Sequence, residues 1–173
     1  VGSTPDNRPS PEKLYNLEAG WEQQWKKSAV QANIYYMYYR DQLVLNGQIN
    51  DVGELLRTNV DESYRLGLEL VAGTQITDGL SIQGNATVSR NRVLAFTEYL
   101  DDYDADFNWI GQQAVKREET DLAFSPGILG SAELRYELLR GNDKQDLLLA
   151  LRGKYVGRRY HDNSSDEKNS LDP

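Results

Sequence analysis

Hydrophobic and polar positions alternate with a period of two along two stretches near the start of the chain. One stretch covers residues 30–38 and the other covers residues 15–22. Because neighbouring side chains of a strand point to opposite faces, this alternation predicts two strands, each with one apolar and one polar face. The apolar face is predicted to carry Tyr15, Leu17, Ala19, Trp21, Val30, Ala32, Ile34, Tyr36 and Tyr38.

The four residues WKKS between these stretches predict a tight turn centred on Lys26 and Lys27. Aromatic residues gather at both ends of the apolar face, with tryptophans beside the turn and tyrosines at the far end. An apolar band between two aromatic belts is typical of strands that cross a bilayer as part of a barrel. The turn predicts the apolar cross-strand pairs Trp21/Ala32, Ala19/Ile34, Leu17/Tyr36 and Tyr15/Tyr38.

Residues 64–76 and 80–91 alternate in the same way and predict a second hairpin. A three-residue loop, Thr77–Gly79, joins them, and we expect Gly79 to adopt a positive φ. This loop length sets apolar residues opposite one another, whereas a two-residue loop would set Leu70 against Thr87, so the pattern fixes the register. The predicted pairs are Ala72/Gly84, Leu70/Ala86 and Leu68/Val88.

A third hairpin is predicted around the loop Gly141–Lys144, closed by Arg140 opposite Gln145. The same register places Glu133 opposite Arg152 on the polar face, where we expect a cross-strand ion pair. The apolar pairs predicted for this hairpin are Leu138/Leu147, Tyr136/Leu149, Leu134/Leu151, Ala132/Gly153 and Gly130/Tyr155.

Two stretches between the hairpins, Arg40–Asn59 and Val93–Ser125, are expected to be long connections. Short turns that alternate with long loops match the periplasmic turns and extracellular loops of outer-membrane barrels. The sequence therefore predicts an all-β fold, in which about six antiparallel strands form part of a transmembrane β-barrel.

A helical alternative stays open at two places. Ser10–Glu12 has proline at the first position of a possible helix, and residues 14, 17, 21 and 25 follow a helical stripe. Ser131–Leu139 is rich in good helix formers. Gly20 within the first stripe and the strict alternation of residues 30–38 both favour strands.

Composition excludes several classes of protein. The chain of 173 residues has no cysteine and a single histidine, which excludes disulfides, thiolate metal sites and paired histidines. The net charge of -8 argues against nucleic acid as a partner. Mean hydropathy is -0.68, and no run reaches the roughly 20 apolar residues of a transmembrane helix, a test that barrel strands escape. No nucleophile motif or phosphate loop occurs, so we predict neither an enzyme nor a cofactor site.

Several segments resemble the C-terminal half of a TonB-dependent outer-membrane receptor of the type common in Bacteroidetes-like bacteria. They are PEKLYNLEAGW, NIYYMYYRDQLVLNGQINDVG, RTNVDESYRLGLEL, GKYVGRRYHDNSS and SLDP, and together they span most of the chain. The resemblance implies a barrel of about 22 strands with an N-terminal plug. Residues 1–173 would then be a partial barrel domain, with the plug and the final strands outside it. The opening residues VGSTP lack a signal peptide, which we interpret as the start of an internal fragment.

The resemblance also implies a function. Such receptors bind a scarce nutrient outside the cell and import it with energy from a TonB complex, which acts through the plug region. Ferric siderophores are the commonest substrate class, with cobalamin, glycans and other metal chelates as alternatives. The expected surroundings are the lipids of the bacterial outer membrane.

Candidate ligand contacts come from the polar faces and from the second long connection. Charges of both signs are expected to face the lumen, as a polar lumen requires even without a specific ligand. Aromatic residues of the connection either pack within the loop or form a platform for an incoming ligand. The candidate contacts are Arg65, Arg135, Arg152, Tyr99, Tyr103 and Trp109.

Two clusters of like charge carry weaker predictions. The acidic run Glu98, Asp101, Asp102, Asp104 and Asp106 could hold calcium, but it lacks the glycine and terminal glutamate of an EF-hand loop, so a solvated loop is the simpler interpretation. Arg158, Arg159 and His161 could attract an anionic ligand or a lipopolysaccharide phosphate, or do nothing specific.

A soluble or surface-attached β-sandwich with a binding or structural role is the alternative from another class. A sandwich would bury its apolar faces against each other. It would not need small residues on the outward face beside aromatic ends.

Overall fold

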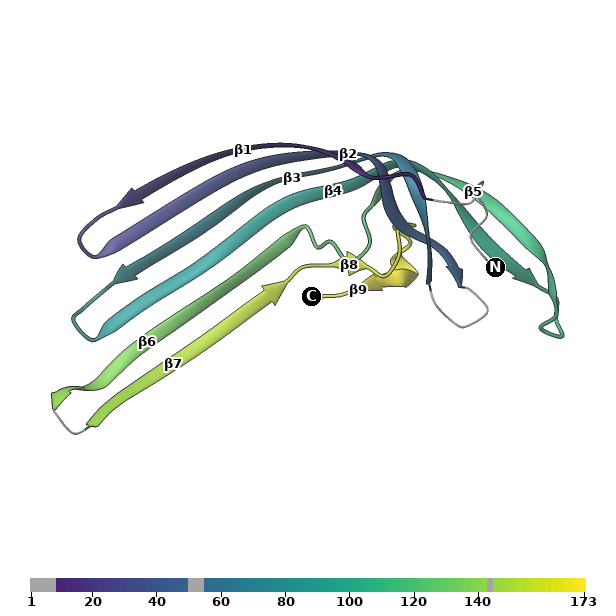
Figure 1. The fold of residues 1–173 in the computed structure, drawn as a ribbon. Helices are drawn as coiled ribbons and strands as arrows, with labels where there is room; N and C mark the ends of the chain where they lie inside the picture. The colour runs from purple at the N-terminus through teal and green to yellow at the C-terminus, as the bar shows by residue number, and fades with distance from the viewer. Residues whose placement is uncertain (1–8, 50–54, 143–144) are drawn as a thin grey trace.

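The computed structural model describes residues 9–49, 55–142 and 145–173, which form one large antiparallel sheet and one small sheet. Figure 1 shows the long strands side by side, in the spatial order β1-β2-β3-β4-β6-β7, with β5 paired only to β4. The small sheet pairs β8 (Arg159–Tyr160) with β9 (Ser170–Leu171), and a short 3-10 helix, Glu167–Asn169, precedes β9. The long strands are β1 (Lys13–Gln24), β2 (Ser28–Ile49), β3 (Leu55–Gln75), β4 (Leu80–Tyr103), β5 (Trp109–Asp121), β6 (Ile128–Asn142) and β7 (Gln145–Val156).

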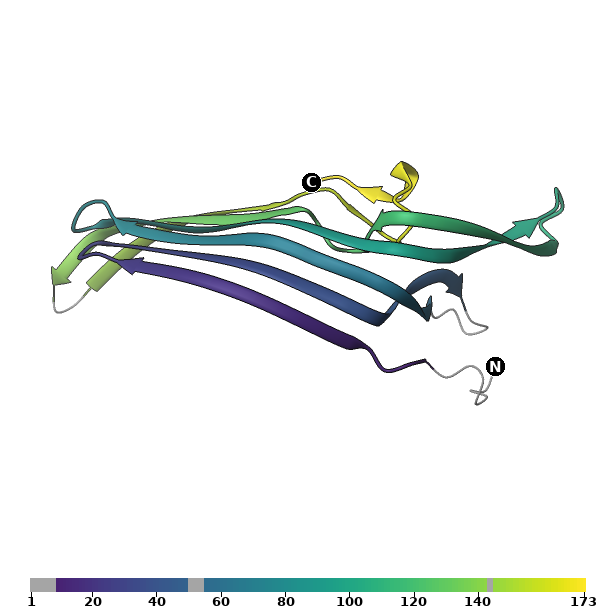
Figure 2. The ribbon, with the colours of Figure 1, turned by 90° about the horizontal axis from the view of Figure 1, so that it is seen from above.

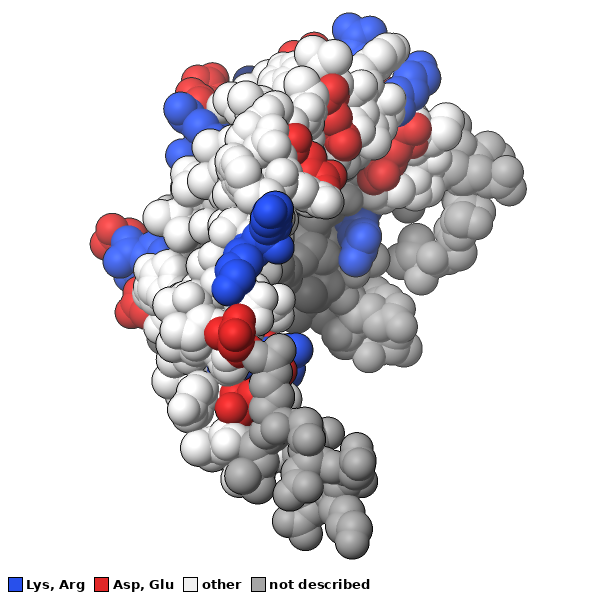
Figure 3. All heavy atoms as spheres, turned by 90° about the vertical axis from the view of Figure 1, so that its left-hand side faces the viewer, with Lys and Arg blue, Asp and Glu red and all other residues white. Residues whose placement is uncertain are grey.

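The large sheet is an open, curved wall. Figures 1 and 2 both place the β1–β2 and β3–β4 turns at one end and the tip of the β4–β5 hairpin at the opposite end. Figure 3, seen from the end with the turns, shows an arc that does not close on itself. The strands at the two ends of the order β1-β2-β3-β4-β6-β7 are β1 and β7. Within the described ranges, no helix is long and apolar enough to cross a membrane.

The predicted registers of the first two hairpins are confirmed. Tyr15 lies opposite Tyr38 and Trp21 opposite Ala32, as the turn at residues 26–27 predicts. In the second hairpin, Leu70 lies opposite Ala86. The helical alternatives at residues 10–25 and 131–139 are wrong, because β1 and β6 occupy these stretches and pair along most of their length. Cross-strand apolar pairs and turn length together outweighed local helix propensity.

The prediction of two long connections is wrong. Strand β2 continues to Ile49 and pairs with β3, for example Val44 with Thr58. Strand β4 continues to Tyr103 and pairs with β5, a long strand in the stretch predicted as a loop. The backbone ladder supplies the hydrogen bonds of these hairpins, and both faces of an exposed hairpin can be polar, so no apolar alternation was there to reveal them.

Two details of the turns also differ from the predictions. Gly79 does not have a positive φ; in this turn the Ile76 N–H donates to the Leu80 carbonyl at 2.8 Å. In the third hairpin the inner pairs are as predicted, from Gly130/Tyr155 to Tyr136/Leu149. Nearer the turn, Leu139 rather than Leu138 lies opposite Leu147, and Asn142 rather than Arg140 lies opposite Gln145. The register shifts twice, between Glu137 and Leu139 and between Leu139 and Asn142, because each step has one more residue on β6 than on β7.

Among the described residues, the buried apolar core is small and lies away from the end of the wall that carries the β1–β2 and β3–β4 turns. It consists of Val44, Val60, Val93 and Leu122, with Phe96 packed against them. Most large apolar side chains are exposed instead; Leu17 is 71% and Leu151 is 73% exposed. No second sheet covers the apolar face of the wall in the described part of the chain, so the β-sandwich alternative is wrong.

Candidate functional site

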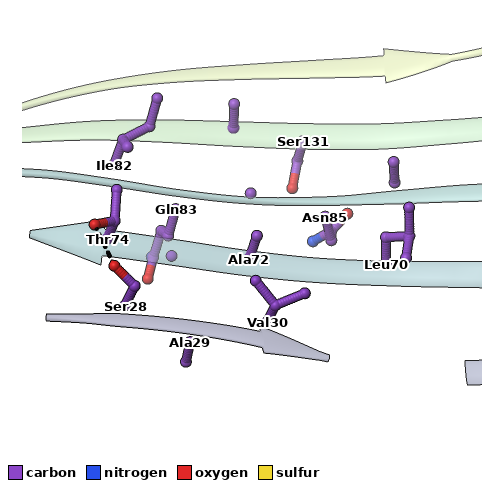
Figure 4. Close-up of a pocket in the computed structure, with 14 residues that line it drawn as sticks. Ser28, Ala29, Val30, Leu70, Ala72, Thr74, Ile82, Gln83, Asn85 and Ser131 are labelled. Atoms are coloured by element: carbon purple, nitrogen blue, oxygen red, sulfur yellow. Dashed lines mark hydrogen bonds between the residues drawn. The ribbon is translucent and has the colours of Figure 1, made fainter. Parts of the chain in front are cut away.

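The outward face of the wall has an apolar hollow of about 510 Å³. It forms because small residues follow one another across the sheet: Ala72 lies opposite Gly84, and Gly84 opposite Ala132. Figure 4 shows the lining, which comes from β2, β3, β4 and β6, with Ser28 and Thr74 hydrogen-bonded at 2.7 Å at one end. Leu70 and Ile82 on its border are 42% and 41% exposed. A face of this size that leaves its leucines and isoleucines uncovered suits an apolar environment rather than water.

The opposite face carries an ion-paired cluster around Glu133. This carboxylate is only 7% exposed and accepts hydrogen bonds from the guanidinium groups of Arg135 and Arg152. The cross-strand pair of Glu133 with Arg152 is therefore confirmed. The cluster borders a polar hollow of about 650 Å³ that is also lined by Lys154 and Asn85. Two of the six candidate contacts thus lie together, held by one buried acid.

Arg65 lies elsewhere on the same polar face, on β3. Its guanidinium carbon is 5.8 Å from the centre of the Tyr39 ring. Its Nε atom is inaccessible to solvent and has no hydrogen-bond partner in the described part of the chain. The side chain lines a cavity of about 160 Å³ together with Gln42 and Asn163.

The aromatic candidates lie at the tip of the β4–β5 hairpin, away from the arginines. Tyr103 pairs with Trp109, and these side chains are 53% and 60% exposed. The Trp109 indole N–H donates to Asp101 at 3.1 Å, which fixes the ring on the surface of the hairpin. Tyr99 is 39% exposed on the same hairpin. The six candidates therefore fall into three places rather than one site.

The wall thus has one apolar face, one polar face whose buried acid is ion-paired, and short turns at one end. Comparison with protein families matched residues 2–172 to the family described as TonB dependent receptor-like, beta-barrel. The chain belongs to the TonB-dependent receptor β-barrel family. No match was found among curated proteins or among solved structures.

Membership of the TonB-dependent receptor family places the chain in the bacterial outer membrane, in a family of receptors and transporters rather than enzymes. The apolar face is consequently the lipid-facing surface of the barrel wall, and the polar face borders the lumen. The resemblance found in the sequence is confirmed over nearly the whole chain.

The acidic run of the receptor hairpin is engaged in separate contacts. Glu98 pairs with Arg117 at 2.7 Å, and Asp101 accepts from Trp109 and Gln112. Asp104 accepts from the backbone N–H groups of residues 106 and 108 at 2.9 and 2.8 Å. The pKa of Asp104 is lowered mainly by the hydrogen bond from the Asn108 side chain, and next by the hydrogen bond from the Asn108 backbone. In the part of the chain that the structure describes, no three acidic or histidine side chains are grouped to hold a metal ion.

The side chains of the predicted basic cluster, Arg158, Arg159 and His161, do not form one binding site. Arg158 lies near two acids, at 3.9 Å from Glu167 and 3.6 Å from Asp172. His161 packs with the edge of its ring against Phe124, at 5.9 Å between ring centres. Two of the three residues of the predicted cluster, Arg158 and His161, thus make contacts within the chain.

Sequence reasoning missed Asn163, which joins the outer segments to the wall. It is 1% exposed, donates to the Leu45 carbonyl at 2.7 Å and accepts from the Ala123 N–H at 2.7 Å. Nearby, Ser165 accepts from the Asp121 N–H at 2.6 Å. These contacts hold residues 157–171 against residues 121–127. Figure 1 shows this part of the chain, with β8 and β9, below β2–β4. In the sequence, only the run DNSS at residues 162–165 indicates an ordered turn, because Asp, Asn and Ser side chains favour turns.

Proposed function

We propose that this chain forms part of the wall of a larger TonB-dependent receptor barrel, which imports a ferric siderophore. The observation that supports this most strongly is the separation of faces: leucines and tyrosines lie uncovered on one side, and the ion-paired Glu133 lies on the other. Edge strands have unpaired backbone groups, which a bilayer does not tolerate, so β1 and β7 need further strands beside them. We infer a barrel of the 22-stranded class, with a plug in its lumen that connects it to TonB.

Two features support a bulky chelate as the substrate. The β4–β5 hairpin presents exposed aromatic surfaces at its tip, where Phe107 is 87% exposed beside Tyr103 and Trp109. The lumen face carries Arg135, Arg152 and Lys154 around a single buried acid, so this part of the wall has an excess of positive charge. Aromatic contacts at the entrance and cationic groups along the wall suit an anionic, partly aromatic iron complex.

The test is uptake of radioactive iron by cells that depend on the receptor carrying this chain. A panel of ferric siderophores is compared with cobalamin and oligosaccharides, in strains with and without TonB. We expect TonB-dependent uptake of at least one ferric siderophore. Uptake of cobalamin or an oligosaccharide instead would refute the substrate, and uptake that persists without TonB would refute the mechanism.

A pair of variants connects the test to the structure. Trp109→Ala and Tyr103→Ala remove the exposed aromatic surface and should weaken capture of the siderophore. Ile110→Ala is the matched control, because Ile110 is equally exposed, at 60%, and apolar but not aromatic. Equal losses of uptake in all three variants would contradict a role for the aromatic rings.

A further inference from the structure

A small cavity beside Arg65 is lined by two arginines and, among the described residues, by no acid. It has a volume of about 160 Å³, and both Arg57 and Arg65 line it. Its other described lining residues are Gln42, Leu43, Val44, Leu45, Leu122, Ala123, Phe124 and Asn163, none of which is acidic.

Several other arginines of the described residues pair with an acid, unlike the two in this cavity. Within the described residues, neither Arg57 nor Arg65 has an ion pair. The described arginines that do pair with a carboxylate are Arg90, Arg92, Arg117, Arg135, Arg152 and Arg158. Pairing with an acid is thus common among the described arginines of this chain, and the two arginines that line this cavity lack such a pair there.

Arg65 is held in place without being satisfied. The ring of Tyr39, 5.8 Å from the guanidinium carbon, supports it by a cation–π contact, and its Nε is inaccessible and makes no hydrogen bond to the described residues. A buried donor without a partner is costly, and an anionic oxygen is the kind of acceptor that suits a guanidinium.

One side of the cavity is formed by residues 122–124 and Asn163, which come from later parts of the chain than the β2 and β3 residues on the other side. Asn163 reaches across to the Leu45 carbonyl and to the Ala123 N–H, which closes one side of the cavity with residues 122–124. Its position near the long hairpins, opposite the short turns, is the outer part of the lumen. An anion that enters from outside would therefore reach this cavity before the deeper hollow around Glu133.

We propose that the Arg57–Arg65 cavity binds a carboxylate or phosphate group of a small molecule that enters the lumen from outside. Its volume is below the roughly 300–1,000 Å³ of sites that enclose a whole drug-sized ligand. It therefore takes a single anionic group, while the rest of the molecule stays in the lumen. Arg65 supplies charge and a planar fork of donors, and Arg57 a second charge. The inference rests on the proposed function only for the origin of the anion, the imported ligand.

The experiment is calorimetric titration of the purified receptor that carries this chain, in detergent micelles, with citrate and separately with inorganic phosphate. Citrate tests for a carboxylate and phosphate for a phosphoryl group. We expect saturable binding of at least one probe, weakened by added salt because the attraction is between charges. Arg65→Gln and Arg57→Gln should each lower the affinity about tenfold or more, since each removes a charge-assisted hydrogen bond.

Two variants keep the test decisive. Arg90→Gln is the matched control, because Arg90 is exposed, pairs with Glu119 at 2.7 Å and does not line the cavity; its affinity should be unchanged. Arg65→Lys keeps the charge and loses the fork, so it should bind more tightly than Arg65→Gln, and it replaces that variant if the glutamine form does not fold. Migration of the unheated protein on a gel reports folding of each variant.

The inference is overturned if neither probe saturates the wild-type receptor, or if Arg65→Gln and Arg90→Gln bind as well as the wild type. Its failure differs from that of the proposed function. If cells with the receptor take up no ferric siderophore but the purified receptor binds the anion, only the siderophore proposal is refuted. Iron uptake without Arg65-dependent anion binding would refute only the present inference.

Discussion

The phenol ring of Tyr35 lies directly over Gly67, its cross-strand partner on β3. Gly67 is buried beneath this ring, and a Cβ atom built on it would come within 2.5 Å of the Tyr35 Cζ and Oη. Tyr35 alternates with the lipid-facing Ile34 and Tyr36, so the pair belongs to the lumen side. Because glycine has no Cβ atom, it leaves room for the Tyr35 ring to lie against β3.

Gly67→Ala should therefore destabilise the receptor by about 1–3 kcal/mol, because the added methyl group displaces the Tyr35 ring. The measurement is urea unfolding of the receptor in lipid vesicles. Gly153→Ala is the control, since a Cβ there meets nothing within 4 Å, and it should change stability by less than about 0.5 kcal/mol. In a Tyr35→Ala background, Gly67→Ala should lose most of its effect. An undiminished effect there would contradict the proposed contact.

Neighbouring leucines on β7 test which face meets lipid. Leu149 lies on the apolar face, opposite Tyr136, and Leu148 lies on the polar face, opposite Glu137. The two are similarly exposed, at 54% and 51%. Leu149→Arg should cost about 2–4 kcal/mol for a position near the membrane midplane, whereas Leu148→Arg faces the lumen and should cost far less. The measurement is the folding free energy in lipid vesicles, and equal costs would refute the assignment of faces.

The Glu133 cluster predicts a strongly non-additive pair of variants. Arg152 is 71% exposed, so Arg152→Gln should cost less than about 1 kcal/mol, and Arg135→Gln a similar amount, since each leaves Glu133 one partner. The double variant leaves a buried carboxylate without a cation and should cost clearly more than the sum. Unfolding of the four proteins completes the cycle. A double variant whose cost equals the sum would show that the arginines act independently.

Much of the wall could be predicted because apolar alternation and turn length determine a register. Leu70 can lie opposite Ala86 only with the loop that the sequence provides, and the structure has that pair. Strand β5 could not be predicted, because Lys116, Arg117 and Glu118 place charge on both of its faces, which leaves no apolar alternation to indicate a strand. The extra residue at the β6 bulge likewise leaves no pattern in composition.

The candidate site was only partly accessible to the same reasoning. The Glu133–Arg152 pair follows from register, and the structure confirms it. Asn163 and Leu45 are 118 residues apart, and no period or motif connects them, so the closure of the Arg65 cavity required the three-dimensional structure. The position of the aromatic hairpin tip likewise depends on β5.

Asp104 predicts a pH-dependent change at the tip of the β4–β5 hairpin, outside the membrane. Its pKa is lowered by hydrogen bonds from Asn108, so its ionised form favours the folded turn. The stabilisation is full above the ordinary aspartate pKa of about 3.9 and is lost as the pH falls through the lower pKa of the folded turn. Carboxyl carbon NMR of the labelled receptor should show Asp104 titrating below the ordinary aspartate pKa. In an Asn108→Ala variant the pKa of Asp104 should rise toward that ordinary value, and an unchanged pKa of Asp104 would contradict the assigned cause.

The orientation of the wall follows from its two kinds of chain reversal. The turns at residues 25–27 and 76–79 are short, whereas β4 and β5 extend as a long hairpin at the opposite end. Outer-membrane barrels keep short turns in the periplasm and long hairpins outside. Asp78 is therefore expected in the periplasm and Asp102 at the cell surface.

Single cysteines can report this orientation, since the sequence contains none of its own. In intact cells with the receptor that carries this chain, Asp102→Cys should react with a membrane-impermeant maleimide. Asp78→Cys should react only after the outer membrane is permeabilised, although the Asp78 side chain is 83% exposed and equally able to react once reached. The permeabilised sample thus serves as the control for reactivity. Reaction of Asp78→Cys in intact cells with Asp102→Cys protected would invert the barrel, because only the membrane distinguishes two exposed positions.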